Sequence, residues 1–236
     1  MRETPPWLPS GLQALPPKLL TCQIIAHPDA ALRQRLGCGD GHVSIGLVTV
    51  DQDDAAYAAL DHATKFAQVD VVYAKSLYAG AAHASGPLSG EIMGVLAGPD
   101  PDEVAEGLAA LRDYLTRSAC FFALRDGPTK PAFFPHVIAE TGHYLSRLAG
   151  IAAGQPLAYL IAPPVEAIVA LDAALKAADV ELKAFFGPPT ETNYAGAYLT
   201  GSLAACEASA AAFAQAVADV AANPLAAARR FDRHRT

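Results

Sequence analysis

Leu60-Asp-His-Ala-Thr-Lys-Phe-Ala-Gln-Val-Asp70 returns 111 positions later in the chain as Leu171-Asp-Ala-Ala-Leu-Lys-Ala-Ala-Asp-Val-Glu181. Six of the eleven aligned residues are identical, and the last pair exchanges Asp for Glu. Solenoid repeats have periods of roughly 20 to 50 residues, so a shift of 111 positions is too long for one. We therefore interpret the two segments as matching helices of a duplicated domain.

A second pair of segments supports the duplication. Residues 137–150 parallel residues 24–37, with Ile, Ala, Leu and Gly at the same four positions. The chain has 236 residues, which allows one large domain or two of about 110 residues, and the repeat favours two. We expect a proline-rich arm at 1–18, a first domain at 19–126, a second domain at 127–224 and a basic tail at 225–236.

The order of the expected elements predicts the fold class. Each copy runs as strand, short helix, strand, helix, strand, strand, helix, which favours an antiparallel or mixed sheet with its helices on one face, the α+β class. In the first copy we expect strands at 19–26, 43–50, 71–74 and 91–97, and helices at 29–37, 51–69 and 102–116. In the second copy the clearest elements are a strand at 196–202 and an Ala-rich helix at 202–222.

The composition is rich in alanine and poor in charge. The chain contains 51 alanines, and only 17% of its residues are charged. Such a chain is expected to hide surface beyond its own core, most simply in an oligomer. The net charge of -7 and the pI near 5.4 argue against a nucleic-acid partner, because binding to phosphates needs clustered Lys and Arg.

The longest uncharged stretch, residues 148–165, is long enough to be considered as a membrane-spanning helix. Glycines and prolines interrupt it, so we interpret it as a loop and a buried strand and expect no membrane partner. The N-terminus carries an acid and prolines where a signal peptide needs an apolar run. We therefore expect a cytoplasmic protein.

The four cysteines are widely spaced and form no C-x-x-C pair. In a cytoplasmic chain they are expected to be reduced, buried small side chains. Cys38 and His42 could supply two metal ligands, but a third and a fourth at suitable spacing are missing. We expect no metal site.

Motifs of enzymes are missing from the sequence. It contains no nucleotide-binding glycine loop, no zinc-protease motif and no nucleophile elbow. An enzyme that uses Asp53, Glu91 and His83 is therefore the least favoured class. We expect no catalytic residue and no cofactor.

Three features each keep two interpretations. Asp51, Asp53 and Asp54 form either a carboxylate cluster or, as we favour, a helix cap. Glu91 is either an exposed strand start or a functional acid. Phe121 is either a core residue or a ligand contact, and the core is the commoner role for such a residue.

Several stretches resemble the EutL-type shell proteins of ethanolamine-utilisation bacterial microcompartments. In the first half they lie between about residues 49 and 101 and include S-L-Y-A-G-A-A-H (76–83) and S-G-E-I-M-G-V-L-A-G-P-D-P (89–101). In the second half the clearest is P-P-T-E-T-N-Y-A-G-A-Y-L-T-G-S (188–202). The likeness covers about residues 19–224.

The resemblance implies a fold and an assembly. The fold would be two tandem, circularly permuted bacterial microcompartment (BMC) domains. Three chains would form a homotrimer that is a pseudohexameric tile, and tiles would pack edge to edge with other shell proteins into the shell of a microcompartment in the cytoplasm. Pores through the tile would pass small metabolites.

The resemblance also implies which residues line these pores. A small acidic pore would contain Asp53, Glu91, Phe121 and Thr192, whose carboxylates and aromatic ring suit protonated ethanolamine. A gate over the central pore would be built from the loops at 76–89 and 187–194. The candidate gating residues are Tyr78, Gly80, His83, Glu191 and Asn193.

A different class of protein fits part of the pattern. A soluble protein that binds or senses an amine could use an acidic cleft between the two domains without forming a shell. It would bind its ligand but form no extended array.

Overall fold

The computed structural model describes residues 4–226. Most of the basic tail expected at 225–236 therefore lies outside the described residues. The strands are β1 (Leu12–Leu15), β2 (Leu19–Ile25), β3 (Ser44–Val50), β4 (Asp70–Ser76), β5 (Ile92–Gly98), β6 (Phe121–Leu124), β7 (Ala132–Ile138), β8 (Leu157–Ala162), β9 (Val180–Phe186) and β10 (Ala195–Gly201). The helices are α1 (Ala30–Arg35), α2 (Asp53–Ala63), α3 (Pro101–Arg117), α4 (His143–Ala149), α5 (Pro164–Ala177) and α6 (Leu203–Ala222), with a 3-10 turn η1 (Ala81–His83).

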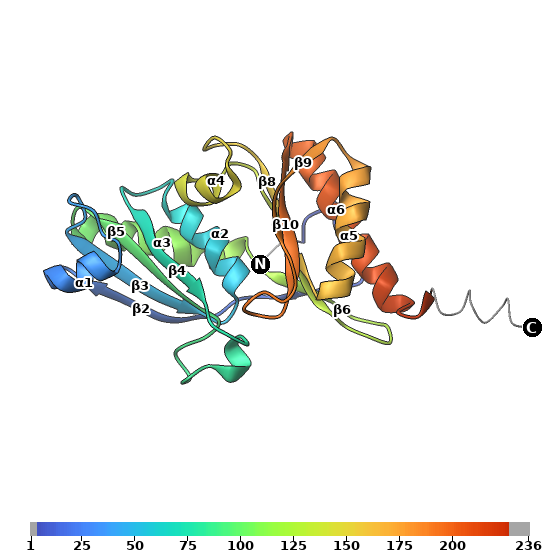
Figure 1. Ribbon diagram of the computed structural model, residues 1–236, viewed down its shortest axis with the longest axis horizontal. Coiled ribbons are helices and arrows are strands. Elements are labelled where there is room, and N and C mark those ends of the chain that lie inside the picture. Colours follow the sequence, from blue (N-terminus) through green and yellow to red (C-terminus); the bar gives the residue numbers. More distant parts are fainter. Residues whose placement is uncertain (1–3, 227–236) are drawn as a thin grey trace, which may run out of the picture.

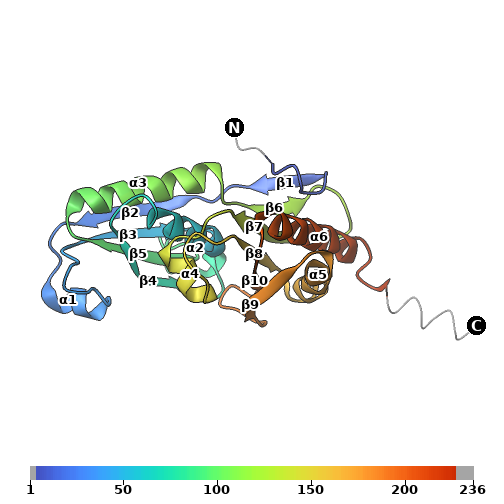
Figure 2. The ribbon, with the colours of Figure 1, turned by 90° about the horizontal axis from the view of Figure 1, so that it is seen from above.

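The strands form two antiparallel sheets, which confirms the predicted α+β class. The first sheet has the order β2-β3-β5-β4, and the second has the order β1-β6-β7-β8-β10-β9. In Figure 1 the first sheet lies at the left, and the second is seen nearly edge-on near the centre. Figure 2 shows α3 lying along the first sheet, while α5 and α6 lie beside the second.

The duplication predicted from the sequence is visible in the strand order. Strands β7-β8-β10-β9 repeat the order of β2-β3-β5-β4, and helices α4, α5 and α6 follow the same strands as α1, α2 and α3. The first residues of α2 and α5, Asp53 and Pro164, stand 111 positions apart, the shift that relates the repeated segments. The two halves are therefore copies of one unit.

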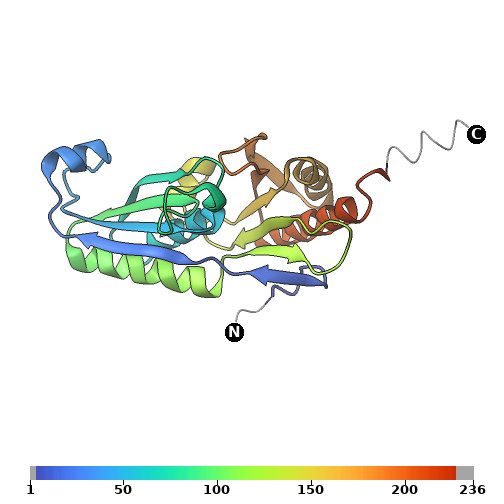
Figure 3. The same ribbon diagram turned by 90° about the horizontal axis from the view of Figure 1, so that it is seen from below.

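The second sheet extends beyond the copied unit. β1 pairs with β6 in register from Leu12 opposite Leu124 to Leu15 opposite Phe121, and Figure 3 shows the two strands side by side. The sequence predicted an extended arm at 1–18 and no strand at 121–124. Strand pairing therefore crosses the predicted boundaries, because β1 from the arm and β6 from the predicted first domain both join the second sheet. The division into folding units stays a prediction.

Helix α2 lies between the two sheets and positions the candidate site. Its alanines and Leu60 belong to one buried cluster with Phe134, Tyr159 and Tyr198 of the second sheet. Along β8, the alternate residues Leu157, Tyr159 and Ile161 face this cluster, while Ala158, Leu160 and Ala162 face α5 and α6. A strand buried on both faces needs no charge, so β8 is the buried strand predicted within the uncharged stretch, which also includes the end of α4 and the start of α5.

Several local predictions have a clear outcome. Asp29 caps α1, as expected, by accepting a hydrogen bond from the amide of Ala31 at 2.8 Å. α2 ends at Ala63, earlier than predicted, in a turn at which Thr64 bonds back to Asp61. All four cysteines are free, but Cys22 is exposed on β2 and Cys38 is only partly buried, so the prediction that all four are buried is confirmed only for Cys120 and Cys206.

Helix α6 is long and apolar enough to cross a membrane by length and composition alone. One of its faces, however, is buried in the core that it forms with α5 and the second sheet, through Phe213, Ala214 and Val217. Core helices commonly meet the same criteria, so this one helix is weak evidence for a membrane.

Candidate functional site

The first turn of α2 carries two buried carboxyls. Asp53 and Asp54 are 5% and 6% exposed, and both border a cavity of about 290 Å³ between the first half of the chain and the second sheet. The cap of α2 is Gln52, whose side chain makes no capping hydrogen bond. Asp51 instead accepts the amide N–H of Lys18 at 2.6 Å. The favoured interpretation of the three aspartates as a helix cap was therefore wrong, because none of them stands at the cap position, although Asp53 and Asp54 do lie in the first turn, where the helix dipole favours acids.

Asp53 joins residues from three parts of the chain. Its Oδ2 accepts a hydrogen bond from Ser76 Oγ at 2.7 Å and one from Thr192 Oγ1 at 3.4 Å. Its amide donates to Glu91 Oε2 at 3.2 Å. Thr192, from the loop before β10, thus contacts Asp53, whose amide in turn contacts Glu91.

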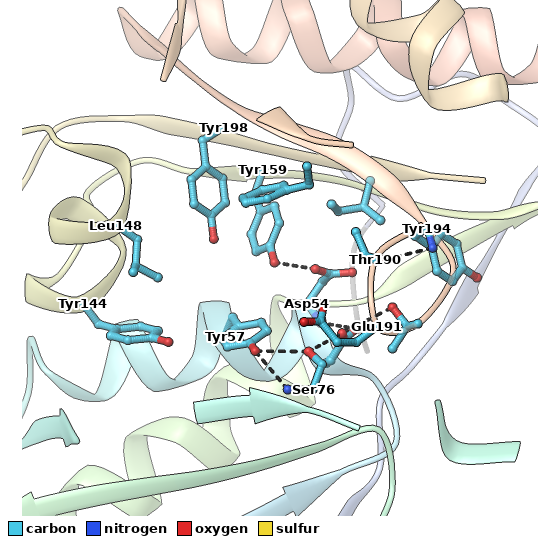
Figure 4. Close-up of a pocket in the computed structure, with 14 residues that line it drawn as sticks. Asp54, Tyr57, Ser76, Tyr144, Leu148, Tyr159, Thr190, Glu191, Tyr194 and Tyr198 are labelled. Carbon is cyan, nitrogen blue, oxygen red and sulfur yellow. Dashed lines mark hydrogen bonds between the residues drawn. The ribbon is translucent and has the colours of Figure 1, made fainter. Parts of the chain in front are cut away.

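Asp54 faces an aromatic wall. The hydroxyl of Tyr159 donates to Asp54 Oδ1, and Tyr57 bonds with Ser76 Oγ at 3.1 Å. Figure 4 shows the hydroxyls of Tyr159 and Tyr198 pointing from the second sheet toward α2. The cavity also has Tyr144, Phe186 and Tyr194 in its lining. A small organic cation would meet ring faces as well as carboxyls here.

The surroundings make these acids hard to ionise. Burial raises the pKa of Glu91 to about 7, and the neighbouring charge of Asp53 acts in the same direction. Burial also raises the pKa of Asp53 and, together with the charge of Asp53, holds that of Asp54 well above its usual range. The site therefore holds negative charge at a cost, which a positively charged ligand would relieve.

No cationic side chain balances this charge within the described residues. The ion pairs between residues 4 and 226 are His42–Asp70, Arg117–Asp113, Lys176–Asp172 and Lys183–Glu181. All four lie outside the acidic cluster. Buried carboxyls without a cationic partner tend to stay neutral unless a cation binds beside them.

Phe121 lies beside Glu91 at a separate, smaller cavity. The two residues border a second cavity of about 100 Å³, and Tyr194 borders both this cavity and the larger one. The centre of the Phe121 ring lies 5.1 Å from the centre of the Phe134 ring and 5.6 Å from that of the Tyr194 ring. Phe121 is therefore a core residue that also borders the acidic site, so both interpretations from the sequence describe part of its position.

The two candidate gating loops touch each other. The amide of Ala79 donates to the carbonyl of Glu191 at 2.7 Å. Ala79 and Asn193 both have positive φ, 63° and 67°, a conformation that non-glycine residues rarely adopt. Glu191 borders the larger cavity, so this loop connects the molecular surface to the acids.

The remaining loop candidates differ in position. Gly80 lies against Glu91, where an added Cβ would come within 2.9 Å of its Oε1. Tyr78 is 85% exposed, and His83 is exposed in η1, outside the linings of both cavities. The structure therefore does not place His83 with Asp53 and Glu91.

Sequence reasoning missed half of the site. Asp54 was considered for a carboxylate cluster, but the cap was favoured and Asp54 was not placed among the pore residues; the tyrosines of β8 and β10 were not considered. One signal was available: Tyr159 and Tyr198 are polar-tipped residues in otherwise apolar strands, and a buried Tyr hydroxyl usually needs a partner. Nothing local in the sequence, however, says that these strands face α2.

Among the described residues, no group of three or more His, Cys, Asp or Glu side chains is arranged so that it could hold a metal ion. His42 has both ring nitrogens engaged, since Nδ1 accepts the amide of Gly39 at 3.0 Å and Nε2 lies 3.0 Å from Asp70 Oδ2. It is therefore not free to join Cys38 as a ligand.

Comparison with known proteins assigns the family. The family model of the BMC domain matches residues 44–123. The bacterial microcompartment shell protein EutL of Clostridium perfringens (strain 13 / Type A) is 52% identical over 209 residues, which cover 89% of this chain and 96% of the relative. The chain belongs to the EutL family of bacterial microcompartment shell proteins.

Other EutL proteins agree over nearly the whole length. EutL of Salmonella typhimurium is 46% identical over 91% of this chain and 98% of the relative. The crystal structure of the ethanolamine utilization protein EutL from Leptotrichia buccalis has a TM-score of 0.88 and 52% identity, covering 90% of this chain and 98% of that one. The EutL fold therefore includes both halves described above, and the family is one of structural shell proteins, not of enzymes.

Proposed function

We propose that this protein is a structural shell protein of an ethanolamine-utilisation microcompartment in the bacterial cytoplasm. Three copies form a homotrimer, a pseudohexameric tile that packs edge to edge with other shell proteins. Membership of the EutL family supports the shell role. The duplicated unit supports the tile, because three chains of two similar units can close into a ring with approximate sixfold symmetry.

The acidic site is proposed as a pore for small protonated amines such as ethanolamine. The observation that carries this proposal is the buried group of Asp53, Asp54 and Glu91, for which the described residues provide no cationic partner. An ammonium group can donate several hydrogen bonds to these acids, while its carbon chain packs on the surrounding rings. Phe121 and Thr192 would border its path.

The contact between the two loops is proposed as the gate of the central pore. The Ala79–Glu191 hydrogen bond joins a loop of the first half to a loop of the second, and two residues of positive φ flank it. Opening of this gate would break the bond between the loops and, at Thr192, the hydrogen bond to Asp53. Glu191 also borders the cavity beside the acids, so an amine bound there lies close enough to favour one loop position.

Calorimetry with ethanolamine tests the pore. Glu91→Gln keeps the shape of the side chain but removes its charge, so we expect ethanolamine to bind at least severalfold more weakly at pH 8, a loss of about 1 kcal/mol or more. Glu106→Gln, on the exposed face of α3, is the matched control and should bind as the wild type does.

The mass of the oligomer in solution is measured on the same samples. Glu91→Gln is expected to form an oligomer of the same mass as the wild type, since Glu91 lies at a site inside the chain. Equal ethanolamine affinity in Glu91→Gln and wild type would remove Glu91 from the pore. Amine binding by a chain that stays monomeric would favour a binding or sensor protein over a shell tile.

A further inference from the structure

The cavities divide the acidic site into two chambers. The smaller chamber, of about 100 Å³, is bordered by Glu91 and Phe121, whereas the larger, of about 290 Å³, is bordered by Asp53 and Asp54. Tyr194 borders both chambers. A two-carbon amine held at Glu91 and Phe121 would therefore leave the larger chamber open to a different molecule.

Aromatic side chains from both halves of the chain line the larger chamber: Tyr57, Tyr144, Tyr159, Phe186, Tyr194 and Tyr198. The ring of Tyr198 lies nearly at right angles to those of Tyr159 and Phe186, with ring centres 4.6 and 4.8 Å apart. Rings in this arrangement offer faces and edges to a further ring or to a branched alkyl group. Pockets for small organic molecules begin at roughly 300 Å³, so the chamber has the size and the lining for an amine larger than ethanolamine.

A buried hydroxyl in this lining has no partner. Tyr144 is only 8% exposed, and its hydroxyl makes no hydrogen bond within residues 4–226. Figure 4 shows this hydroxyl pointing toward Tyr57 and the acids. Buried tyrosine hydroxyls usually find a hydrogen-bond partner, and a donor group of a molecule bound in the chamber would supply one.

Asp54 is the carboxyl with the most capacity to accept hydrogen bonds from a ligand. The oxygens of Asp53 are both engaged, Oδ1 by the amide of Asp54 and Oδ2 by the hydroxyls of Ser76 and Thr192. Asp54 accepts the hydroxyl of Tyr159 at Oδ1, a partner that brings no positive charge. A primary ammonium group brings both a charge and N–H donors, whereas a quaternary ammonium has no N–H to donate.

The larger chamber reaches the surface beside α4. Leu148 on α4 is 49% exposed and borders the chamber, as does the exposed Glu191. Figure 4 shows Leu148 and Tyr144 on one side of Asp54 and Tyr194 on the other. A molecule that enters past Leu148 therefore meets apolar side chains first and the carboxyl of Asp54 inside.

We propose that the larger chamber is a second amine site, which binds a primary amine with an aromatic or branched apolar tail. The ammonium group pairs with Asp54, and the tail packs against Tyr198 and Leu148. This site is additional to the ethanolamine pore proposed above, and it rests on that proposal only in treating the acids as binders of ammonium groups. Because Glu91 does not border this chamber, the two amines occupy different places in the chain.

Isothermal calorimetry with 2-phenylethylamine and with ethanolamine at pH 8 tests the second site. Asp54→Asn keeps an oxygen that can accept the Tyr159 hydroxyl but removes the charge, so it should weaken 2-phenylethylamine at least tenfold, and by a larger factor than ethanolamine. Glu91→Gln should show the opposite order. The uncharged analogue 2-phenylethanol should bind the wild type at least tenfold more weakly than 2-phenylethylamine does.

Tyr144→Phe is a second variant, with little risk to the fold, because the hydroxyl that it removes makes no hydrogen bond within the described part of the chain. It should weaken 2-phenylethylamine about threefold or more. Tyr73→Phe, on β4 and outside the linings of both chambers, is the matched control and should bind 2-phenylethylamine as the wild type does.

The outcomes separate the second site from the pore. If the wild type binds ethanolamine but not 2-phenylethylamine, the second site is wrong and the pore stands. If Asp54→Asn and Glu91→Gln each weaken the two amines by the same factor, the chain has one amine site and the proposal is overturned. Binding of 2-phenylethylamine without binding of ethanolamine supports the second site and contradicts the pore.

Discussion

At the scale of single residues, Glu91 connects burial to a response near neutral pH. Its carboxylate oxygen accepts a hydrogen bond from the amide N–H of Asp53 at 3.2 Å, and the carboxyls of Asp53 and Asp54 lie close by. Burial and the charge of Asp53 raise the pKa of Glu91 to about 7. The charge that attracts a cation is therefore only partly formed at the pH of the cytoplasm.

The first prediction concerns the pH dependence of ethanolamine binding. An aliphatic ammonium stays protonated well above neutral pH, so the titrating group is Glu91, which gains its charge as pH rises through about 7. We expect the affinity to increase severalfold between pH 6 and pH 8. Isothermal calorimetry across this range measures it.

The matched control is Glu91→Gln, which cannot titrate at this position. The variant should lose most of the pH dependence between pH 6 and pH 8. An affinity that changes equally with pH in both proteins would show that another group is responsible.

The site residues that could be predicted from the sequence are those that lie in motifs of the family. Asp53, Glu91 and Thr192 were proposed from the family resemblance, and the structure brings them together by hydrogen bonds at 3.2 and 3.4 Å. Their role in a pore stays a prediction. Tyr159 escaped notice because its position against Asp54 depends on how two distant elements pack, which no local pattern encodes.

At the scale of elements, the start of α4 depends on a residue of another helix. Gly142 occupies its cap position and has no side chain to offer. Asp61 of α2 supplies the missing acceptor, and Thr64 Oγ1 accepts the amide of His143 at 3.0 Å. A Cβ at position 142 would come within 2.3 Å of the Asp61 carbonyl, so only glycine allows so close an approach.

The second prediction compares Asp61→Asn with Asp172→Asn. The repeat places the two residues at the same position, but Asp61 is buried among backbone donors, whereas Asp172 forms an exposed pair with Lys176. The side-chain amide introduced by Asp61→Asn would set a donor against a donor, and we expect a loss of about 1 to 3 kcal/mol in the free energy of unfolding. Urea unfolding at one fixed protein concentration measures this loss.

Asp172→Asn serves as the control and should change the free energy of unfolding by about 0.5 kcal/mol or less, since exposed ion pairs contribute little. Equal effects of the two substitutions would contradict the assigned role of Asp61. The comparison also shows a limit of the sequence: the repeated Leu-Asp predicted two matching helices correctly, but it could not reveal that only one of the aspartates caps a neighbour.

At the scale of the whole molecule, the duplication could be predicted from the sequence, but the pairing of β1 with β6 in the second sheet could not. The shift of 111 positions indicates the number of units, and the order of the elements indicates the α+β class that the two sheets confirm. The pairing of β1 with β6 joins positions more than a hundred residues apart. Each of these strands has only four residues, and the alternation of apolar and polar side chains over so short a stretch cannot distinguish a strand from an irregular extended arm.

The alanine-rich composition is consistent with this arrangement. Alanines of α2 allow the helix to lie between two sheets, and those of α5 and α6 allow the two helices to pack closely. Several exposed apolar residues lie on α5, where Val165, Ile168 and Val169 are between 46% and 67% exposed. The low content of charge fits both the close packing inside the chain and the proposed contacts between chains.

The most direct test of the account is the mass of the full-length protein in solution, measured by sedimentation equilibrium at micromolar concentration. The proposed trimeric tile requires a species of three times 24.5 kDa. A stable monomer of 24.5 kDa under these conditions would contradict the account.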